Sequence, residues 1–461
     1  MYDFLIKDGL VVDFDQKKLI SADVALQGGK IAEVGQNLGE SKRTISAKGK
    51  VVAPGFIDIH MHEEFAREGS DQIHYDISRN MLLMGVTTAV AGNCGNNRFP
   101  VGFFKNYIEE HGSPVNYLTY IGHNYLREQA GITDRYREAT GEEIDRMKEL
   151  LLKALHQGVI GISFGLEYSP GVTLKEVEAL VTPFKDHPLL LAAHYRKDAK
   201  YALESIREMI EISRRTTLPM IVSHISSCAA FGMMDEALEI IEKAKEEGLD
   251  ISVDSYPYNA FSTFIGSAVF DEGCFELWGK GPEIIFLTEE PYKGQYCDMD
   301  LFKKVRAEHP DMLVATFAMD EKDIGYAVAH PDVMIASDGV LREGQGHPRA
   351  AGTYPRVLGH YVRERKALSL YDALYKMTLL PAKRLGLDGR KGQIRKGYDG
   401  DLVIFDPETV IDRATFEEPT LPPAGIDYVF VAGQPAAKGQ EVLRENLGTY
   451  IDHPLMRSVK G

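Results

Sequence analysis

Short apolar runs alternate with amphipathic stretches through the middle of the chain. Apolar positions at helical spacing occupy residues 144–155, and the apolar run 159–164 follows after a glycine. The same order recurs with a helical pattern over 237–244 and the run 251–254. Strands that alternate with helices are typical of parallel β/α units. The pattern therefore predicts an α/β fold with a (β/α)8 TIM-type barrel over residues 56–385. Such barrels carry their catalytic groups at the carboxyl ends of the strands.

Both ends of the chain follow a different pattern. Residues 1–55 contain short strand-like runs separated by turns, including a predicted hairpin over 23–34. Residues 397–406 and 428–433 are also strand-like, and no helical periodicity joins them. We therefore expect one small β-sandwich domain built from residues 1–55 and 386–461.

The segment from about residue 263 to residue 320 is longer than an ordinary β/α connection. It contains Trp278, several glycines and prolines, and two of the four cysteines. We interpret it as an insertion near the barrel mouth that could act as a lid. The alternative is an elaboration of the surface away from the site.

The composition is that of an ordinary globular protein, with 44% hydrophobic and 26% charged residues. The net charge of -16 argues against binding to nucleic-acid phosphates. No apolar run approaches the roughly 18 residues that span a membrane, and residues 1–9 lack the pattern of a signal peptide. These features predict a cytoplasmic protein with no nucleic-acid or membrane partner. Disulfides are not expected among four widely spaced cysteines: Cys94, Cys228, Cys274 and Cys297.

Two histidines follow the first strand of the predicted barrel. A Pro-Gly pair precedes the apolar run 56–59, which leads into His60 and His62. Side chains alternate along a strand, so the two imidazoles point the same way and can bind one metal ion. Other apolar runs also end in residues of metal-binding type, namely Cys94, His194, His224 and Asp338.

Six such residues at strand ends predict a zinc centre. Imidazole and thiolate are good zinc ligands, and a catalytic zinc site keeps one position open for water. The metal lowers the pKa of that water toward neutrality. Asp338 is the candidate that takes the water's proton and delivers it to the leaving nitrogen.

The segment 54–62 resembles the first-strand signature of the amidohydrolase superfamily, which comprises metal-dependent hydrolases on a (β/α)8 barrel. Nearly the whole chain resembles the D-aminoacylase (N-acyl-D-amino-acid deacylase) family within it. Five segments carry this closer resemblance: Gly92-Asn93-Cys94-Gly95, residues 165–171, residues 256–263, Ser337-Asp338-Gly339 and His347-Pro348-Arg349.

The resemblance implies a role for each residue of the predicted centre. Cys94, His194 and His224 would hold a tightly bound zinc ion. His60, His62 and Asp338 would form an adjacent, weaker metal position, with Asp338 as the general acid/base. The residues implied to bind the substrate are Tyr168, Tyr256, Ser262 and Arg349.

The chain departs from the family pattern at two places. Residues 63–64 are both glutamate where the family has two aspartates. Ser226 stands where the family has a lysine that pairs with the α-carboxylate of the substrate. The planar guanidinium of Arg349 suits a carboxylate and remains for this charge, with Arg196 and Lys197 as further candidates.

Together these features predict a zinc-dependent hydrolase that cleaves a linear amide with metal-activated water. The expected small-molecule substrate is an N-acyl-D-amino acid or a related N-acyl compound. The first alternative is a cyclic-amide hydrolase of the hydantoinase or dihydroorotase type. Many of these use a carboxylated lysine, but no lysine ends the run 159–164. The second alternative is a non-catalytic barrel that serves as an assembly partner, which the six ligand-type residues argue against.

Overall fold

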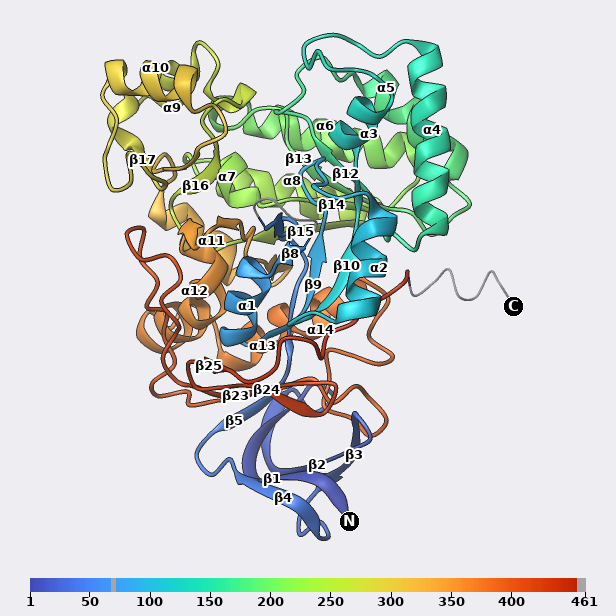
Figure 1. Ribbon diagram of the computed structural model, residues 1–461, viewed down its shortest axis with the longest axis vertical. Coiled ribbons are helices and arrows are strands. Elements are labelled where there is room, and N and C mark those ends of the chain that lie inside the picture. The colour runs from blue at the N-terminus through green and yellow to red at the C-terminus, as the bar shows by residue number, and fades with distance from the viewer. Residues whose placement is uncertain (68–71, 454–461) are drawn as a thin grey trace.

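The computed structural model describes residues 1–67 and 72–453, which form a mixed α/β structure (Figure 1). Two sheets in its centre are parallel throughout. The first has the strand order β10 (Asn116–Thr119), β9 (Val86–Ala91), β6 (Phe56–Asp58). The second has the order β11 (Ile121–Gly122), β12 (Gly161–Gly165), β13 (Leu190–His194), β14 (Met220–Val222), β15 (Ile251–Ser255), β19 (Val333–Ile335).

Helices lie between these strands in sequence and around them in space (Figure 1). The predicted helix over 144–155 lies within α4 (Gly141–His156), which begins with a capping box between Thr140 and Glu143. The predicted helix over 237–244 lies within α8 (Met234–Glu246). Apart from two in the long segment after β15, the other α-helices are α1 (Asp76–Leu83), α2 (Val101–His111), α3 (His123–Gln129), α5 (Leu174–Val181), α6 (Ala202–Thr216), α7 (Ile225–Ala229), α11 (Glu321–Ala329), α12 (Arg349–Arg356), α13 (Leu370–Met377) and α14 (Leu379–Arg384).

The two ends of the chain meet in one nine-stranded sheet, drawn at the bottom of Figure 1. Strand β5 pairs with β1 in parallel and with β22 in antiparallel orientation. The predicted hairpin is formed by β2 and β3, and both glycines of its turn have positive φ. The predicted sandwich and its boundaries, which include residues 454–461 outside the described part, stay a prediction. The strands are β1 (Tyr2–Asp13), β2 (Lys18–Gln27), β3 (Lys30–Gly35), β4 (Ser41–Ser46), β5 (Val51–Pro54), β22 (Leu402–Phe405), β23 (Ile426–Val431), β24 (Gln434–Lys438) and β25 (Glu441–Val442).

The long segment after β15 has secondary structure of its own. Strands β16 (Phe261–Phe264), β17 (Ile285–Leu287) and β18 (Leu313–Thr316) form a small antiparallel sheet. It also contains α9 (Cys274–Trp278) and α10 (Met299–Glu308), drawn in yellow in Figure 1. The indole N–H of Trp278 donates to Asp198 at 2.8 Å and so fastens this segment to the loop after β13.

No helix in residues 1–67 and 72–453 is long and apolar enough to cross a membrane. The four cysteines are buried free thiols.

Candidate functional site

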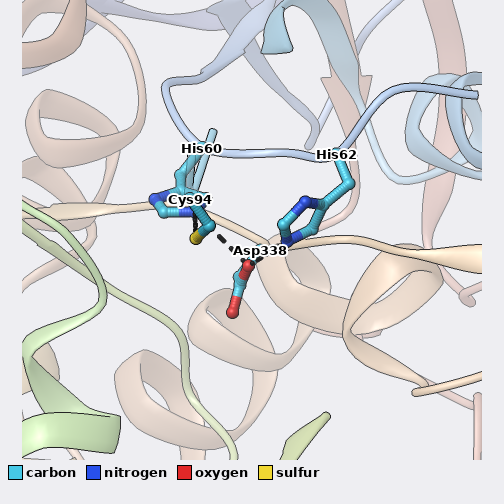
Figure 2. Close-up of side chains that lie close together, drawn as sticks. All are labelled: His60, His62, Cys94 and Asp338. Atoms are coloured by element: carbon cyan, nitrogen blue, oxygen red, sulfur yellow. Dashed lines mark hydrogen bonds and ion pairs between the residues drawn. The ribbon is translucent and has the colours of Figure 1, made fainter. Parts of the chain in front are cut away.

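The six predicted ligand residues converge at the carboxyl ends of the parallel strands. They form two groups, and within each group the ligand atoms lie within 4.8 Å of one another. Figure 2 shows the first group, with the side chains of His60, His62, Cys94 and Asp338 turned toward one another. The second group is Cys94, His194 and His224. The sulfur of Cys94 therefore belongs to both groups and lies between them.

Three of these residues adopt a left-handed backbone conformation two or three residues after their strands end. The φ angles are 54° at Cys94, 34° at His224 and 50° at Asp338. This conformation costs a non-glycine residue about 1–3 kcal/mol and is found at functional sites. At Asp338 a hydrogen bond supports this conformation: its backbone N–H donates to the carbonyl of His60 at 2.8 Å. The abrupt turn directs each side chain toward the common centre.

The spacing between the Cys94 sulfur and two histidines fits a zinc ion, and the two histidines of the second group lie slightly closer together. The sulfur of Cys94 lies 3.3 Å from His60 Nε2 and 3.4 Å from His224 Nε2, and His194 Nδ1 lies 3.0 Å from His224 Nε2. Tetrahedral zinc with ordinary Zn–N and Zn–S bonds places neighbouring ligand atoms about 3.3–3.6 Å apart. Burial raises the pKa of the Cys94 thiol, but the positive charges of His60 and His224 outweigh it and hold the pKa well below its usual range. A thiolate is the form that binds metal.

Each of three histidines contacts an oxygen with the ring nitrogen that points away from the centre. This second contact fixes the orientation of a metal-binding imidazole. The pairs are His60 Nδ1 with Asp254 Oδ2 at 3.4 Å, His194 Nε2 with Glu167 Oε2 at 2.9 Å, and His224 Nδ1 with Ser227 Oγ at 2.8 Å. These three oxygen partners were not predicted from the sequence. The available signal was position, because Asp254 ends the apolar run 251–254 and Glu167 lies in the segment 165–171.

Asp338 contacts a histidine with one oxygen and an arginine with the other. Its Oδ1 lies 3.0 Å from His62 Nε2, and its Oδ2 lies 2.9 Å from Arg349 Nη1. Burial alone raises the pKa of this carboxyl group. The positive charges of Arg349 and His60 outweigh burial and hold the pKa of Asp338 well below its usual range. The group is therefore a carboxylate that can accept a proton.

Two cavities open beside these groups. The larger, of about 490 Å³, is lined by His62, Tyr168 and Ser262 among others. A small cavity of about 20 Å³ is lined by the same three residues and by Tyr256 and Asp338. The hydroxyls of Tyr256 and Ser262 are buried, that of Ser262 has no hydrogen-bond partner within the described ranges, and that of Tyr256 lies beside Ser227. Buried polar groups of this kind are normally satisfied, so these hydroxyls indicate a place for a polar ligand.

Arg349 lies one layer behind the small cavity and lines neither cavity. Its guanidinium carbon lies 4.6 Å from the centre of the Tyr256 ring, and Nη2 donates to the carbonyl of Ser262 at 3.3 Å. Its Nε is buried without a partner in the described part of the chain. The structure thus brings Arg349 together with Tyr256, Ser262 and Asp338.

The structure does not bring Ser226 into this group. Its hydroxyl is fully buried within α7 and lines neither cavity, whereas the adjacent Ser227 lines the small one. The two further cations lie elsewhere, because Arg196 forms an ion pair with Glu208 at 2.7 Å and Lys197 stacks on Tyr201 at 5.1 Å.

The two glutamates after His62 bind the backbone rather than the metal groups. Glu63 accepts hydrogen bonds from the N–H groups of Arg98 and Phe99. Glu64 accepts from the first turn of α1 at 2.7 and 2.9 Å and from the hydroxyl of Tyr117 at 3.0 Å. Both carboxylates therefore anchor the loop that carries His62.

Comparisons with known proteins agree with this geometry. The chain matches the amidohydrolase family over residues 43–276 and 319–437. It is 33% identical to a D-aminoacylase of Alcaligenes xylosoxydans xylosoxydans, over 98% of this chain and 97% of the relative. A solved D-aminoacylase with a binuclear metal centre superposes with a TM-score of 0.86 at 31% identity, covering 98% of this chain and all of that one. N-acyl-D-glutamate deacylase from Bordetella bronchiseptica, solved with zinc and a phosphonate mimic of the tetrahedral intermediate, also has a TM-score of 0.86, at 29% identity, with 98% and 99% covered.

Proposed function

Because the chain belongs to the amidohydrolase family, in its D-aminoacylase branch, we propose that it is a zinc-dependent hydrolase that deacylates N-acyl-D-amino acids. The observation that carries this function is the pair of ligand groups that share Cys94, one of which includes the carboxylate of Asp338, with two cavities beside them. The reaction is hydrolysis of a linear amide, a carbon–nitrogen bond outside a peptide chain.

We assign the tight zinc position to Cys94, His194 and His224. His60, His62 and Asp338 form the weaker position, and Cys94 is close enough to contribute to it. When bound, zinc polarises both a water molecule and the substrate carbonyl. The thiolate and the imidazoles would hold the ion. The oxygens of Asp254, Glu167 and Ser227, which contact the outer ring nitrogens of the histidines, keep the rings in the binding orientation.

Asp338 moves the proton in this mechanism. Its carboxylate lies at the edge of the small cavity, where it can accept a proton from the attacking water and pass it to the leaving nitrogen. Arg349 keeps it ionised before substrate binds. His62, 3.0 Å away, fixes the direction of the accepting oxygen.

The hydroxyls of Tyr256 and Ser262 donate hydrogen bonds to the α-carboxylate of the substrate. Burial raises the pKa of Tyr256, so its hydroxyl keeps the proton that it donates. Arg349 supplies the positive charge from behind the Tyr256 ring. Tyr168, whose ring centre lies 4.6 Å from that of His194, forms the wall between the two cavities.

We also propose a (β/α)8 barrel over residues 56–385, with a composite β domain from residues 1–55 and 386–461 and an insertion at about 263–320. The support is the strand order, in which β10 and β11 are nearly continuous in sequence. The chain just after β6 and the chain just after β19 are joined by a parallel bridge between Met61 and Gly339, so the first and last strands of the combined order are also neighbours. The small antiparallel sheet contributes Ser262 and Thr263 to the larger cavity, which supports a place at the barrel mouth.

The substrate is a small molecule, and we expect no nucleic-acid partner. The net charge of -16 supports this, because phosphate backbones are bound by basic surfaces. A cytoplasmic location follows from the sequence alone and stays a prediction.

A hydrolysis screen with zinc-loaded protein tests the proposed function. The substrates are N-acetyl-D-amino acids, their L-enantiomers, dipeptides and hydantoins, with released amine as the readout. We expect turnover of N-acetyl-D-amino acids that is lost in Asp338→Asn. Turnover of hydantoins alone, or no turnover of any N-acyl compound, would contradict the proposal.

A further inference from the structure

The carboxylate of Asp254 contacts one residue from each ligand group. Asp254 lies in β15 and is 1% exposed. Its Oδ1 accepts the backbone N–H of His224 at 2.8 Å, and its Oδ2 lies 3.4 Å from Nδ1 of His60. The first contact supports the left-handed backbone of His224, and the second faces the ring of His60 from behind.

We propose that Asp254 is a positioning residue that sets the two metal positions apart, an inference that rests on the zinc binding proposed above. A carboxylate has only acceptor oxygens, so His60 must carry a proton on Nδ1 to contact it. Nε2 of His60 then presents its lone pair to the centre, where it lies 3.3 Å from Cys94 Sγ and 3.4 Å from Asp338 Oδ1. Asp254 thus controls the ring of a ligand in the weaker position and only the backbone of a ligand in the tight one.

Asp254→Asn separates these two tasks. An amide has one acceptor oxygen, and the backbone N–H of His224 needs it because that N–H is buried. The NH₂ of the new amide then faces Nδ1 of His60. Either two donors oppose each other, or His60 moves its proton to Nε2 and loses the lone pair that binds the metal. Both outcomes weaken the His60 position and spare the Cys94, His194 and His224 position.

Equilibrium dialysis of the full chain against zinc, with metal content measured by mass spectrometry, tests this inference. Loss of a back-face partner typically lowers metal affinity about 10–100-fold. We expect Asp254→Asn to lower the zinc affinity of the weaker position, which contains His60, by that factor. The zinc affinity of the tight position should change by less than about threefold. Equal weakening of both positions, or of neither, would overturn the inference.

Asp58→Asn is the matched control. Asp58 is also a fully buried carboxylate beside His60, but its Oδ1 accepts the backbone N–H groups of His60 at 3.2 Å and Ser337 at 3.0 Å and does not face the His60 ring. An amide oxygen can accept both, so both zinc affinities should stay within about threefold of wild type. A selective loss of zinc from the weaker position in Asp58→Asn as well would show that any buried carboxylate near His60 has this effect, and would also overturn the inference.

A measurement on the wild-type chain covers the case in which Asp254→Asn fails to fold. In protein loaded with cadmium-113 and labelled with nitrogen-15 at histidine, the metal should couple to Nε2 of His60 while Nδ1 keeps its proton. Assignment uses the signal that disappears in His60→Ala. Coupling to Nδ1, or a single metal equivalent at saturation, would overturn the role of Asp254. Binding of no metal by the wild type would instead contradict the proposed function.

Discussion

The ion pair between Arg349 and Asp338 makes Arg349→Ala a decisive substitution in this site. The two side chains are 0% and 8% exposed and approach to 2.9 Å, and the guanidinium stacks on Tyr256. The substitution removes a positive charge that acts on two anions. One is the carboxylate of Asp338, and the other is the α-carboxylate of the proposed substrate.

The two effects differ in size for different substrates. A unit charge about 6 Å from a carboxylate contributes roughly 3 kcal/mol at an effective dielectric constant of 20, or about 100-fold in an equilibrium constant. The effect through Asp338 acts on every substrate, and we expect about 10-fold from the disturbed proton transfer. Loss of kcat/KM should therefore be roughly 10²–10³-fold for an N-acyl-D-amino acid and about 10-fold for its amide, which has no charge to hold.

The pH dependence of activity should change in a defined direction. Burial raises the pKa of Asp338, and Arg349 is the largest opposing influence in the wild type. Without Arg349 the pKa of Asp338 rises. A proton acceptor must be ionised, so activity is lost as the pH falls through its pKa. The acidic limb of the kcat/KM profile should therefore lie at higher pH in Arg349→Ala than in the wild type.

The assay is steady-state kinetics of zinc-loaded protein with N-acetyl-D-leucine and its amide, between about pH 5 and 9. Arg356→Ala is the matched control, because Arg356 lies on the same helix α12, pairs with Asp412 at 3.2 Å and stacks on Tyr258 at 4.8 Å. Arg356→Ala should lose no more kcat/KM for the acid than for the amide, and the acidic limb of its pH profile should stay where it is in the wild type. Equal losses for acid and amide in Arg349→Ala would refute the charge argument, and an unmoved acidic limb would refute the role assigned to the ion pair.

Three further substitutions test single parts of the site. Cys94→Ala should lose zinc from both groups, since the thiolate belongs to both, while Cys228→Ala, at a buried cysteine outside them, should keep its metal content. Asp338→Asn should keep the tight zinc and lower kcat by roughly 10²–10⁴-fold, and turnover within a few-fold of wild type would mean that another group moves the proton. Tyr256→Phe should raise KM for N-acetyl-D-leucine by about 10-fold or more and leave its amide nearly unchanged, because a hydrogen bond to a charged group contributes about 1.5–3 kcal/mol; similar changes for both substrates would remove Tyr256 from carboxylate recognition.

The six ligand-type residues could be predicted because the signal is local. An apolar run followed by a histidine, cysteine or aspartate marks a strand end, and parallel strands bring those ends to one edge. The helices over 144–155 and 237–244 were predicted from periodicity for the same reason, and the structure confirms both. The predicted run 159–164 is a strand only from Gly161.

The oxygens that contact the outer ring nitrogens of the metal-binding histidines could not be predicted, because they depend on tertiary contacts. Asp254 is 194 residues from His60 in sequence, and only the neighbouring places of β15 and β14 bring its carboxylate between His60 and His224. The left-handed backbone at Cys94, His224 and Asp338 also had no signal, since none of these residues is a glycine. The pairing of Arg349 with Asp338 depends on where α12 begins, which the motif alone does not show.

Ser226 stands where the family pattern has a lysine, so this chain lacks that positive charge. Asp338 and a bound α-carboxylate are both negative, and no lysine or arginine of the described chain lines the small cavity. Arg349 already pairs with Asp338, and the arginines that line the larger cavity are Arg98, Arg127 and Arg135. In the proposed function, the hydroxyls of Tyr256 and Ser262, which line the small cavity, carry more of the recognition than they would beside a lysine. We therefore expect carboxylate recognition to depend more on directed hydrogen bonds here than in a site that has the lysine.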